Sequence, residues 1–159
     1  MEVIRKLDLN DLEQIISLRI EIQNYDLRYV ESNKNILNEE ELIQKTKEYI
    51  ENNLDKNLYM FGIFKDDELI ANCGFYLDRH FPTYQNPTGM IAYICNVYTK
   101  EEYREKGYQG KVFQVCLNYA RKINIKLFKL SSLNEKAINM YESFGFERKN
   151  NVFSLEVKS

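Results

Sequence analysis

The stretch MIAYICNVYT, residues 90–99, is apolar, aromatic or β-branched at almost every position. A strand with one face in water alternates apolar and polar residues, and this stretch does not. It therefore predicts a strand that is buried on both faces, in the middle of a sheet. Such a strand needs cover on each side, which favours a layered domain of strands and helices.

Further strands are predicted where β-branched, aromatic and other apolar residues run together between turn residues. These stretches are EVIRKLDL, LYMFGIF, ELIANCGFYL, KLFKL, FERKN and VFSLEVK. The second and third are joined by a hairpin turn at residues 65–67, and the last two by a turn at residues 150–151. With helices between them, the order predicts an α/β or α+β fold in a single domain over residues 1–159. We expect a mixed sheet of six to seven strands with helices on both faces.

Helix starts are marked by capping residues. Asn10 with Glu13, and Asn38 with Glu41, have the spacing of a capping box. Apolar residues at helical spacing follow each pair. Two further helices are predicted over residues 111–120 and 134–144.

Two glycines, Gly107 and Gly110, stand where the strand over residues 90–99 gives way to the helix at Lys111. The first N–H groups of a helix have no intrahelical partner, and the helix dipole adds about half a positive charge there. Glycine lets a phosphate approach the backbone and can take the positive φ that such a turn needs. The turn therefore predicts an anion site suited to a pyrophosphate. The alternative is a turn that needs glycine for its geometry alone.

Charge and composition exclude several classes of protein. Lys and Arg total 22 against 24 Asp and Glu, a net charge of −2, so no basic field holds a nucleic acid. Cys73, Cys95, Cys116 and the single His80 form neither a disulfide framework nor a metal-ligand set. No apolar run approaches the roughly 20 residues of a membrane span, and the charged start is unlike a signal peptide. We therefore expect a cytoplasmic protein without metal, nucleic acid or membrane partners.

The sequence Arg104-x-x-Gly107-x-Gln109-Gly110 resembles the acyl-CoA-binding motif of the GNAT superfamily, the Gcn5-related N-acetyltransferases, which reads Gln/Arg-x-x-Gly-x-Gly/Ala. A second stretch, NEKAINMYESFGF, is similar to the family's later motif, Asn-x-x-Ala-x-x-x-Tyr-x-x-x-Gly-Phe. The two motifs together are far more specific than either alone. Gln109 departs from the first pattern, and its N–H can still donate to a pyrophosphate if its side chain points away.

The resemblance implies a GNAT-like fold and an N-acetyltransferase that uses acetyl-CoA, a coenzyme A thioester, as acyl donor. In the family the strand end pairs with pantetheine, the glycine turn holds the pyrophosphate, and an Asn of the later motif contacts the coenzyme. The residues at matching positions are Val97, Tyr98, Thr99, Arg104, Glu105, Lys106, Gly107, Tyr108, Gln109, Gly110 and Asn134. Tyr141 matches the family's acid for the leaving thiolate.

These residues also have structural interpretations. Tyr141 shares a helical face with Ala137 and Ile138, as a core residue would, and Asn134 is a suitable N-cap. Two alternatives to an enzyme also stay open. One is a non-catalytic acyl-CoA-binding or regulatory module on the same fold, and the other is a structural domain that binds no CoA.

By the resemblance, the acceptor is a primary amine of a small molecule or a peptide, and it must lose a proton before it attacks. The candidates for the base are Tyr93, Asn96 through a water molecule, and His80, none of which matches a fixed family position. Cys95 is either a nucleophile in a two-step transfer or an apolar filler. The family favours direct transfer.

Acceptor specificity is expected in two segments, residues 25–55 and the loop RHFPTYQNPTG. Residues 26–55 hold eight acidic and four basic side chains, a balance of −4 that favours a cationic acceptor. The alternative is a solvated helix face. The resemblance also allows a homodimer in which the terminal strands of two chains pair.

Overall fold

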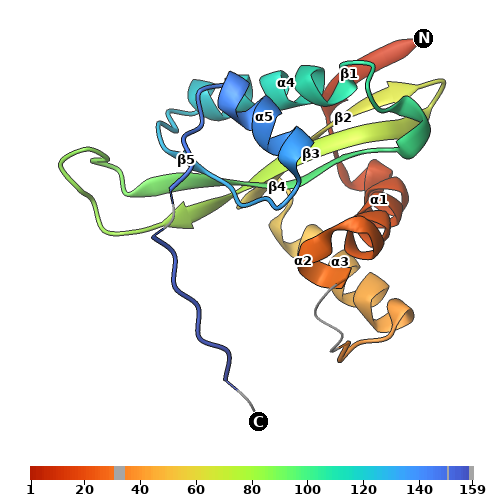
Figure 1. Ribbon diagram of the computed structural model, residues 1–159. Coiled ribbons are helices and arrows are strands. Elements are labelled where there is room, and N and C mark those ends of the chain that lie inside the picture. Colours follow the sequence, from red (N-terminus) through yellow and green to blue (C-terminus); the bar gives the residue numbers. More distant parts are fainter. Residues whose placement is uncertain (31–34, 150, 158–159) are drawn as a thin grey trace.

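A computed structural model describes residues 1–30, 35–149 and 151–157 (Figure 1). Within these residues one five-stranded sheet has the order β1-β2-β3-β4-β5. The strands are β1 (Glu2–Lys6), β2 (Leu58–Lys65), β3 (Glu68–Arg79), β4 (Met90–Thr99) and β5 (Phe128–Lys129). β1 to β4 pair antiparallel and β5 is parallel to β4. The predicted mixed sheet is confirmed, with five strands where six to seven were expected.

Helices cover both faces of this sheet, as predicted (Figure 1). They are α1 (Leu12–Tyr25), α2 (Leu27–Val30), α3 (Glu39–Asn53), α4 (Tyr108–Lys122) and α5 (Glu135–Ser143), with short 3-10 turns at Leu9–Asp11 and Glu101–Tyr103. α4 and α5 lie on one face, and α1 and α3 on the other. α3 begins at its predicted cap, where Asn38 Oδ1 accepts a hydrogen bond from the Glu41 N–H at 2.8 Å.

The predicted capping box at Asn10 and Glu13 is wrong. The box forms two residues earlier, where Asp8 caps the 3-10 turn and Asp11 accepts a hydrogen bond from the Asp8 N–H at 2.9 Å. Arg5 donates to both carboxylate oxygens of Asp11 at 2.8 Å. This ion pair with β1 fixes where the helical segment begins, and a local sequence pattern does not reveal it.

The terminal strand pair predicted from FERKN and VFSLEVK does not form in the described residues, although the turn at residues 150–151 lies partly outside them. Phe153, Leu155 and Val157 are 95%, 89% and 85% exposed. A strand satisfies its backbone groups only against a partner edge, and β5 is only two residues long. A prediction based only on the alternation of apolar residues therefore overestimated the number of strands in the sheet.

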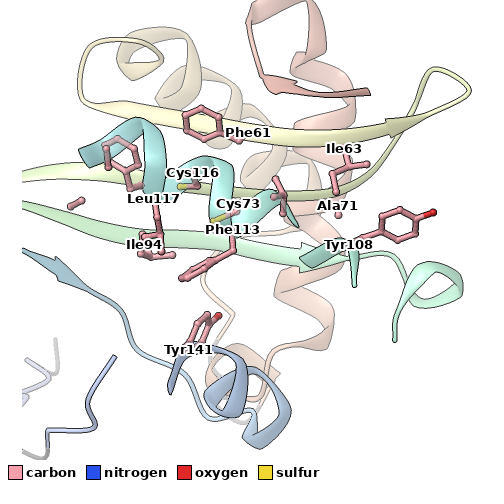
Figure 2. Close-up of a cluster of buried hydrophobic side chains, with 14 of the residues drawn as sticks. Phe61, Ile63, Ala71, Cys73, Ile94, Tyr108, Phe113, Cys116, Leu117 and Tyr141 are labelled. Atoms are coloured by element: carbon pink, nitrogen blue, oxygen red, sulfur yellow. The ribbon is translucent and has the colours of Figure 1, made fainter. Parts of the chain in front are cut away.

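Two apolar cores, one on each face of the sheet, hold the helices in place. On the α4 face, Phe113 is completely buried. Its ring centroid lies 5.4 Å from that of Tyr141 (Figure 2) and 4.9 Å from that of Phe144. Full burial of a phenylalanine side chain stabilises the fold by roughly 1.5–3 kcal/mol. This core therefore fixes α5 against α4 and the sheet.

β4 bends near its C-terminal end, where it pairs with β3 on one side and with no strand of the described residues on the other. The register between β3 and β4 shifts between Asn72 and Gly74, and Asn96 has a φ of 55°, so β4 carries a bulge that bends it. β4 pairs with β5 only through Ala92 and Tyr93. Beyond Tyr93, the outer edge of β4 has no strand partner among the described residues.

Candidate active site

A cavity of about 1570 Å³ opens beside the free edge of β4. Its first wall is formed by the end of β4, the turn into α4, and the segment from β5 through α5. Every residue that matched a family position lines this wall, including Tyr141, with the exception of Lys106. Lys106 instead donates from Nζ to the Glu102 carbonyl at 3.1 Å. The fold thus brings the two sequence motifs together on one surface.

The turn from β4 into α4 presents a row of free backbone donors. No N–H from Glu105 to Gly110 has an acceptor among the described residues. Glu105 has a φ of 61° and Gly107 of 81°, and such left-handed residues can turn successive N–H groups toward one anion. A Cβ built at Gly107 or Gly110 would meet nothing within 4 Å. The turn is therefore open to a phosphate group at the positive end of α4.

The side chain of Gln109 points away from this donor row. Its Oε1 accepts a hydrogen bond from Thr99 Oγ1 at 2.8 Å, and its Nε2 donates to the Asn72 carbonyl at 3.5 Å. Both contacts hold the side chain against β3 and β4. The departure from the family pattern at Gln109 therefore leaves the donor row intact.

Arg104 connects the turn to the end of β4 and to the end of α1. Its Nε donates to the Thr99 carbonyl at 2.9 Å. Its guanidinium carbon lies 4.4 Å from the ring centroid of Tyr25 and 5.2 Å from that of Tyr98, within cation–π range. Arg104 thus joins the end of α1 to the donor row and places a positive charge beside it.

Tyr141 is 6% exposed and lines the cavity. Its ring centroid lies 5.4 Å from that of Phe113 (Figure 2) and 6.2 Å from that of Phe146. Its hydroxyl has no hydrogen-bond partner among the described residues. Burial raises the pKa of this phenol, so the hydroxyl keeps its proton. Tyr141 is therefore both a packing residue and a free hydrogen-bond donor at the cavity.

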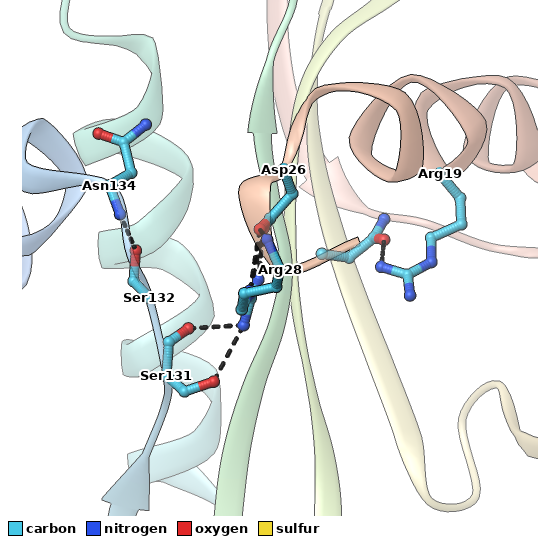
Figure 3. Close-up of polar contacts among 7 residues, drawn as sticks. Arg19, Asp26, Arg28, Ser131, Ser132 and Asn134 are labelled. Carbon is cyan, nitrogen blue, oxygen red and sulfur yellow. Dashed lines mark hydrogen bonds and ion pairs between the residues drawn. The ribbon is translucent and has the colours of Figure 1, made fainter. Parts of the chain in front are cut away.

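Asn134 has the capping role that its position suggested. Its Oδ1 accepts hydrogen bonds from the N–H groups of Lys136 at 3.0 Å and Ala137 at 3.3 Å, and its own N–H donates to Ser132 Oγ at 3.2 Å (Figure 3). Its Nδ2 has no partner among the described residues, and the residue lines the cavity. Capping α5 therefore leaves this amide free to bind a ligand.

One contact at the cavity was not predicted. Arg28 donates from Nη1 to the carbonyl of Ser131 at 2.8 Å and to its Oγ at 2.9 Å (Figure 3). Asp26 holds the same guanidinium at 2.6 Å. The contact joins α2 to the loop between β5 and α5, and no motif marks either partner.

The second wall of the cavity is formed by α1, α3, β2, β3 and neighbouring residues of β4. Its residues are Ile15, Arg19, Ile22, Leu42, Lys45, Thr46, Tyr49, Ile50, Leu58, Met60, Tyr76, Tyr93 and Cys95. Most of them are aromatic or apolar. The rings of Tyr76 and Tyr93 stack with centroids 5.3 Å apart. The charged members are Arg19 and Lys45.

The chain matches the model of a family described as the Acetyltransferase (GNAT) family over residues 22–146. This span holds the turn from β4 into α4 and the motif on α5. The chain belongs to the GNAT acetyltransferase family. The resemblance that the two motifs indicated is thereby confirmed.

Solved structures share the fold of this GNAT protein over almost its whole length. One, described as a predicted acetyltransferase with acetyl-CoA from Clostridium acetobutylicum, has a TM-score of 0.83 and 23% identity, covering 98% of this chain and 96% of that one. A GCN5-related N-acetyltransferase from Ralstonia eutropha has a TM-score of 0.81 and 17% identity, with 99% of both chains covered. A glucosamine-6-phosphate N-acetyltransferase from Arabidopsis thaliana has a TM-score of 0.69 and 17% identity, again with 99% of both covered. No curated protein sequence matches significantly.

The candidates for the base differ in their positions in this GNAT protein. Tyr93 and Asn96 line the cavity. His80 does not, and its Nε2 lies 2.7 Å from Asp78 Oδ2 at an exposed site. The loop over residues 80–89 contributes nothing to the cavity and lies at the far tip of the β3–β4 hairpin (Figure 1). The loop therefore does not border this cavity, and its role in acceptor specificity stays a prediction.

Cys95 lies on the second wall but is unsuited to act as a nucleophile. Burial raises the pKa of its thiol to about 12, and the charge of the nearby Arg19 only partly opposes this rise. The reactive form of cysteine is the thiolate, which is scarce at neutral pH when the pKa is this high. The chemistry of Cys95 therefore favours the interpretation as an apolar filler.

The acidic side chains of residues 26–55 do not make the cavity of this GNAT protein acidic. Asp26 lines the cavity but is paired with Arg28, and Glu31 lies outside the described residues. The remaining acids are exposed and do not line the cavity: Glu39, Glu40, Glu41, Glu48, Glu51 and Asp55. They form the solvated helix face that was the alternative interpretation.

None of the helices in the described part of the chain has the length and apolar character that crossing a membrane requires. In the same part, no three His, Cys, Asp or Glu side chains are grouped so that they could hold a metal ion.

Proposed function

We propose that this GNAT protein transfers an acetyl group from acetyl-CoA to a primary amine by direct attack. The observation that carries the proposal is that one cavity joins the free N–H row of residues 105–110, the unpaired edge of β4 and the free hydroxyl of Tyr141. The structural neighbours support it, since one is described with acetyl-CoA and another is named as an N-acetyltransferase of an amino sugar.

The first wall fits the chemistry of acetyl-CoA. The N–H row of residues 105–110 offers preorganised donors for the pyrophosphate at the positive end of α4. Backbone groups of Val97, Tyr98 and Thr99 on the free edge of β4 would pair with the amides of pantetheine as an added strand does. The free Nδ2 of Asn134 lies on the same wall. Donor binding thus uses backbone groups more than charged side chains.

The transfer forms a C–N bond and breaks a C–S bond. The neutral amine attacks the thioester carbonyl, and donors near β4 stabilise the negative oxygen of the tetrahedral intermediate. The sulfur leaves as that intermediate collapses, and Tyr141 donates a hydrogen bond to it as negative charge develops. The amine nitrogen loses its proton to solvent or to a group on the second wall. Because burial raises the pKa of Tyr49 and of Tyr76, neither of these tyrosines is suited to be the base at neutral pH.

Binding of acetyl-CoA is expected to stabilise the protein strongly. At about 100 times the dissociation constant, a ligand adds about 2.7 kcal/mol to the free energy of unfolding, which raises the Tm of a domain of this size by roughly 5–10 °C. Thermal unfolding with acetyl-CoA and with S-acetylpantetheine, which lacks the pyrophosphate, measures this effect. We expect a smaller shift with S-acetylpantetheine at equal concentration.

Transfer itself is tested with a panel of primary amines. Free thiol and acetylated amine are measured together by absorbance and mass spectrometry, and the two should appear in equal amounts. Stabilisation by acetyl-CoA without an acetylated product from any amine would contradict the proposal and favour a module that only binds acyl-CoA. Absence of both effects would contradict the donor site as well.

A further inference from the structure

The second wall of the cavity contains two cationic side chains. Arg19 projects from α1 and Lys45 from α3. The acid nearest to them in the cavity lining is Asp26 at the end of α1, and it is already paired with Arg28. The acidic side chains of α3 are exposed and do not line the cavity. The wall nearest to an incoming amine is therefore positive, although residues 26–55 carry a net negative charge.

Arg19 forms no ion pair among the described residues, although Asp26, which is paired with Arg28, is close enough to interact with its charge. Its Nη1 donates to Asn96 Oδ1 at 3.3 Å (Figure 3), and its guanidinium carbon lies 5.4 Å from the ring centroid of Tyr29. No carboxylate among the described residues lies within ion-pairing distance of it or of Lys45. A half-buried guanidinium gains most from a partner that supplies both charge and acceptor oxygens. Arg19 therefore offers a binding site for an anionic group.

The rest of the second wall suits an apolar or aromatic ligand body. Tyr76 and Tyr93 stack nearly parallel, with 8° between their planes, beside Tyr49 and aliphatic side chains of α3 and β2. Aromatic surfaces of this kind bind flat or apolar groups with little loss of side-chain entropy. A compact polycation would meet two like charges here, and the nearby carboxylate of Asp26 is already paired with Arg28.

We infer that the acceptor is a small primary amine that also carries an anionic group, a carboxylate or a phosphate, on an apolar or aromatic body. This inference rests on the proposed function and adds the substrate class. Arg19 binds the anion, Lys45 adds a weaker attraction from the rim, and the tyrosines contact the body. The attacking nitrogen then faces the free edge of β4, where the acyl donor binds.

The test is a binding measurement on the protein without coenzyme, so that it does not depend on turnover. Three probes share one body: N-acetylphenylalanine, its phosphonate analogue, and N-acetylphenethylamine, which has no anion. Calorimetry on the wild type should show that an anionic probe binds at least about 10-fold more tightly than the neutral one. A charge-assisted hydrogen bond lowers the Kd by about this factor. Preference for the carboxylate would indicate an amino-acid-like acceptor, and preference for the phosphonate a phosphate-bearing one.

Variants of the second wall test which side chains produce this affinity ratio between the anionic and the neutral probe. Arg19→Gln should reduce it to about two, the share left to Lys45. Arg19→Lys should keep most of the ratio, and Lys45→Gln should lower it about 2-fold. Lys47→Gln is the control, since Lys47 lies on the same helix, is exposed and does not line the cavity; it should leave the ratio unchanged. Equal or tighter binding of the neutral probe, no binding of any probe, or an undiminished ratio in Arg19→Gln would overturn the inference.

Turnover separates this inference from the proposed function. If neutral or polycationic amines are acetylated and their anionic counterparts are not, the substrate class is wrong and the transfer reaction stands. If acetyl-CoA neither binds nor reacts, the proposed function fails whatever the probes show.

Discussion

Replacement of Tyr141 by Phe is expected to lower kcat about 100-fold, the lower end of the range for loss of a positioned acid. The variant keeps the ring that packs against Phe113 and removes only a hydroxyl that has no hydrogen-bond partner among the described residues. The KM for acetyl-CoA and the free energy of unfolding should therefore change little. Steady-state kinetics together with thermal unfolding of both proteins measure these effects.

The pH profile gives this prediction a second readout. Because burial raises the pKa of Tyr141, the acid is protonated at neutral pH and stays so beyond the usual tyrosine pKa of about 10. The rate for the wild type should rise with pH as the amine loses its proton. Deprotonation of Tyr141 should not lower the rate below about pH 10. Tyr119→Phe is the control, because Tyr119 packs in the same core outside the cavity. Unchanged turnover in Tyr141→Phe at every pH would contradict the assigned role.

Replacement of Gly110 by Asp is expected to raise the Kd of acetyl-CoA at least about 100-fold, because like charges brought together cost several kcal/mol. The added side chain has room, since a Cβ at Gly110 meets nothing within 4 Å. A carboxylate in the first turn of α4 also interacts favourably with the helix dipole. The fold should therefore survive while the pyrophosphate is excluded. Calorimetric titration with acetyl-CoA measures the loss.

Gln114→Asp is the matched control for this variant. Gln114 is an exposed residue of α4 that does not line the cavity, so the change adds the same charge to the same helix. Its affinity for acetyl-CoA should stay within about 2-fold of the wild type. Equal affinity of the Gly110→Asp protein and the wild type would mean that the pyrophosphate binds elsewhere.

The donor side of the site could be predicted because its elements are local in sequence. Residues 90–122 contain in sequence a strand with apolar residues on both faces, a turn with Gly107 and Gly110, and an amphipathic helix. The backbone geometry of these elements then determines the free N–H row. The α5 motif carried Asn134 and Tyr141 in the same way. Such short-range patterns indicate the fold and the anion site without knowledge of distant contacts.

The acceptor side could not be predicted, because its contacts join distant parts of the chain. Arg19 and Asn96 are 77 residues apart, and Arg28 and Ser131 are 103 apart. The net charge of residues 26–55 did not decide between a cationic acceptor and a solvated helix face, because which face of α3 lines the cavity matters more than the sum of its charges. The terminal residues failed for a related reason, since a strand pattern requires a free partner edge that only tertiary structure reveals.

The central claim is that the N–H row of residues 105–110 and the free edge of β4 hold acetyl-CoA. Amide NMR of the 15N-labelled protein, titrated with acetyl-CoA and with S-acetylpantetheine, tests it most directly. We expect the chemical shifts of the amides of residues 105–110 to change with acetyl-CoA but not with S-acetylpantetheine. The chemical shifts of the amides of residues 94–99 should change with both ligands. Saturation with acetyl-CoA that leaves the amides of residues 105–110 unshifted would contradict the account.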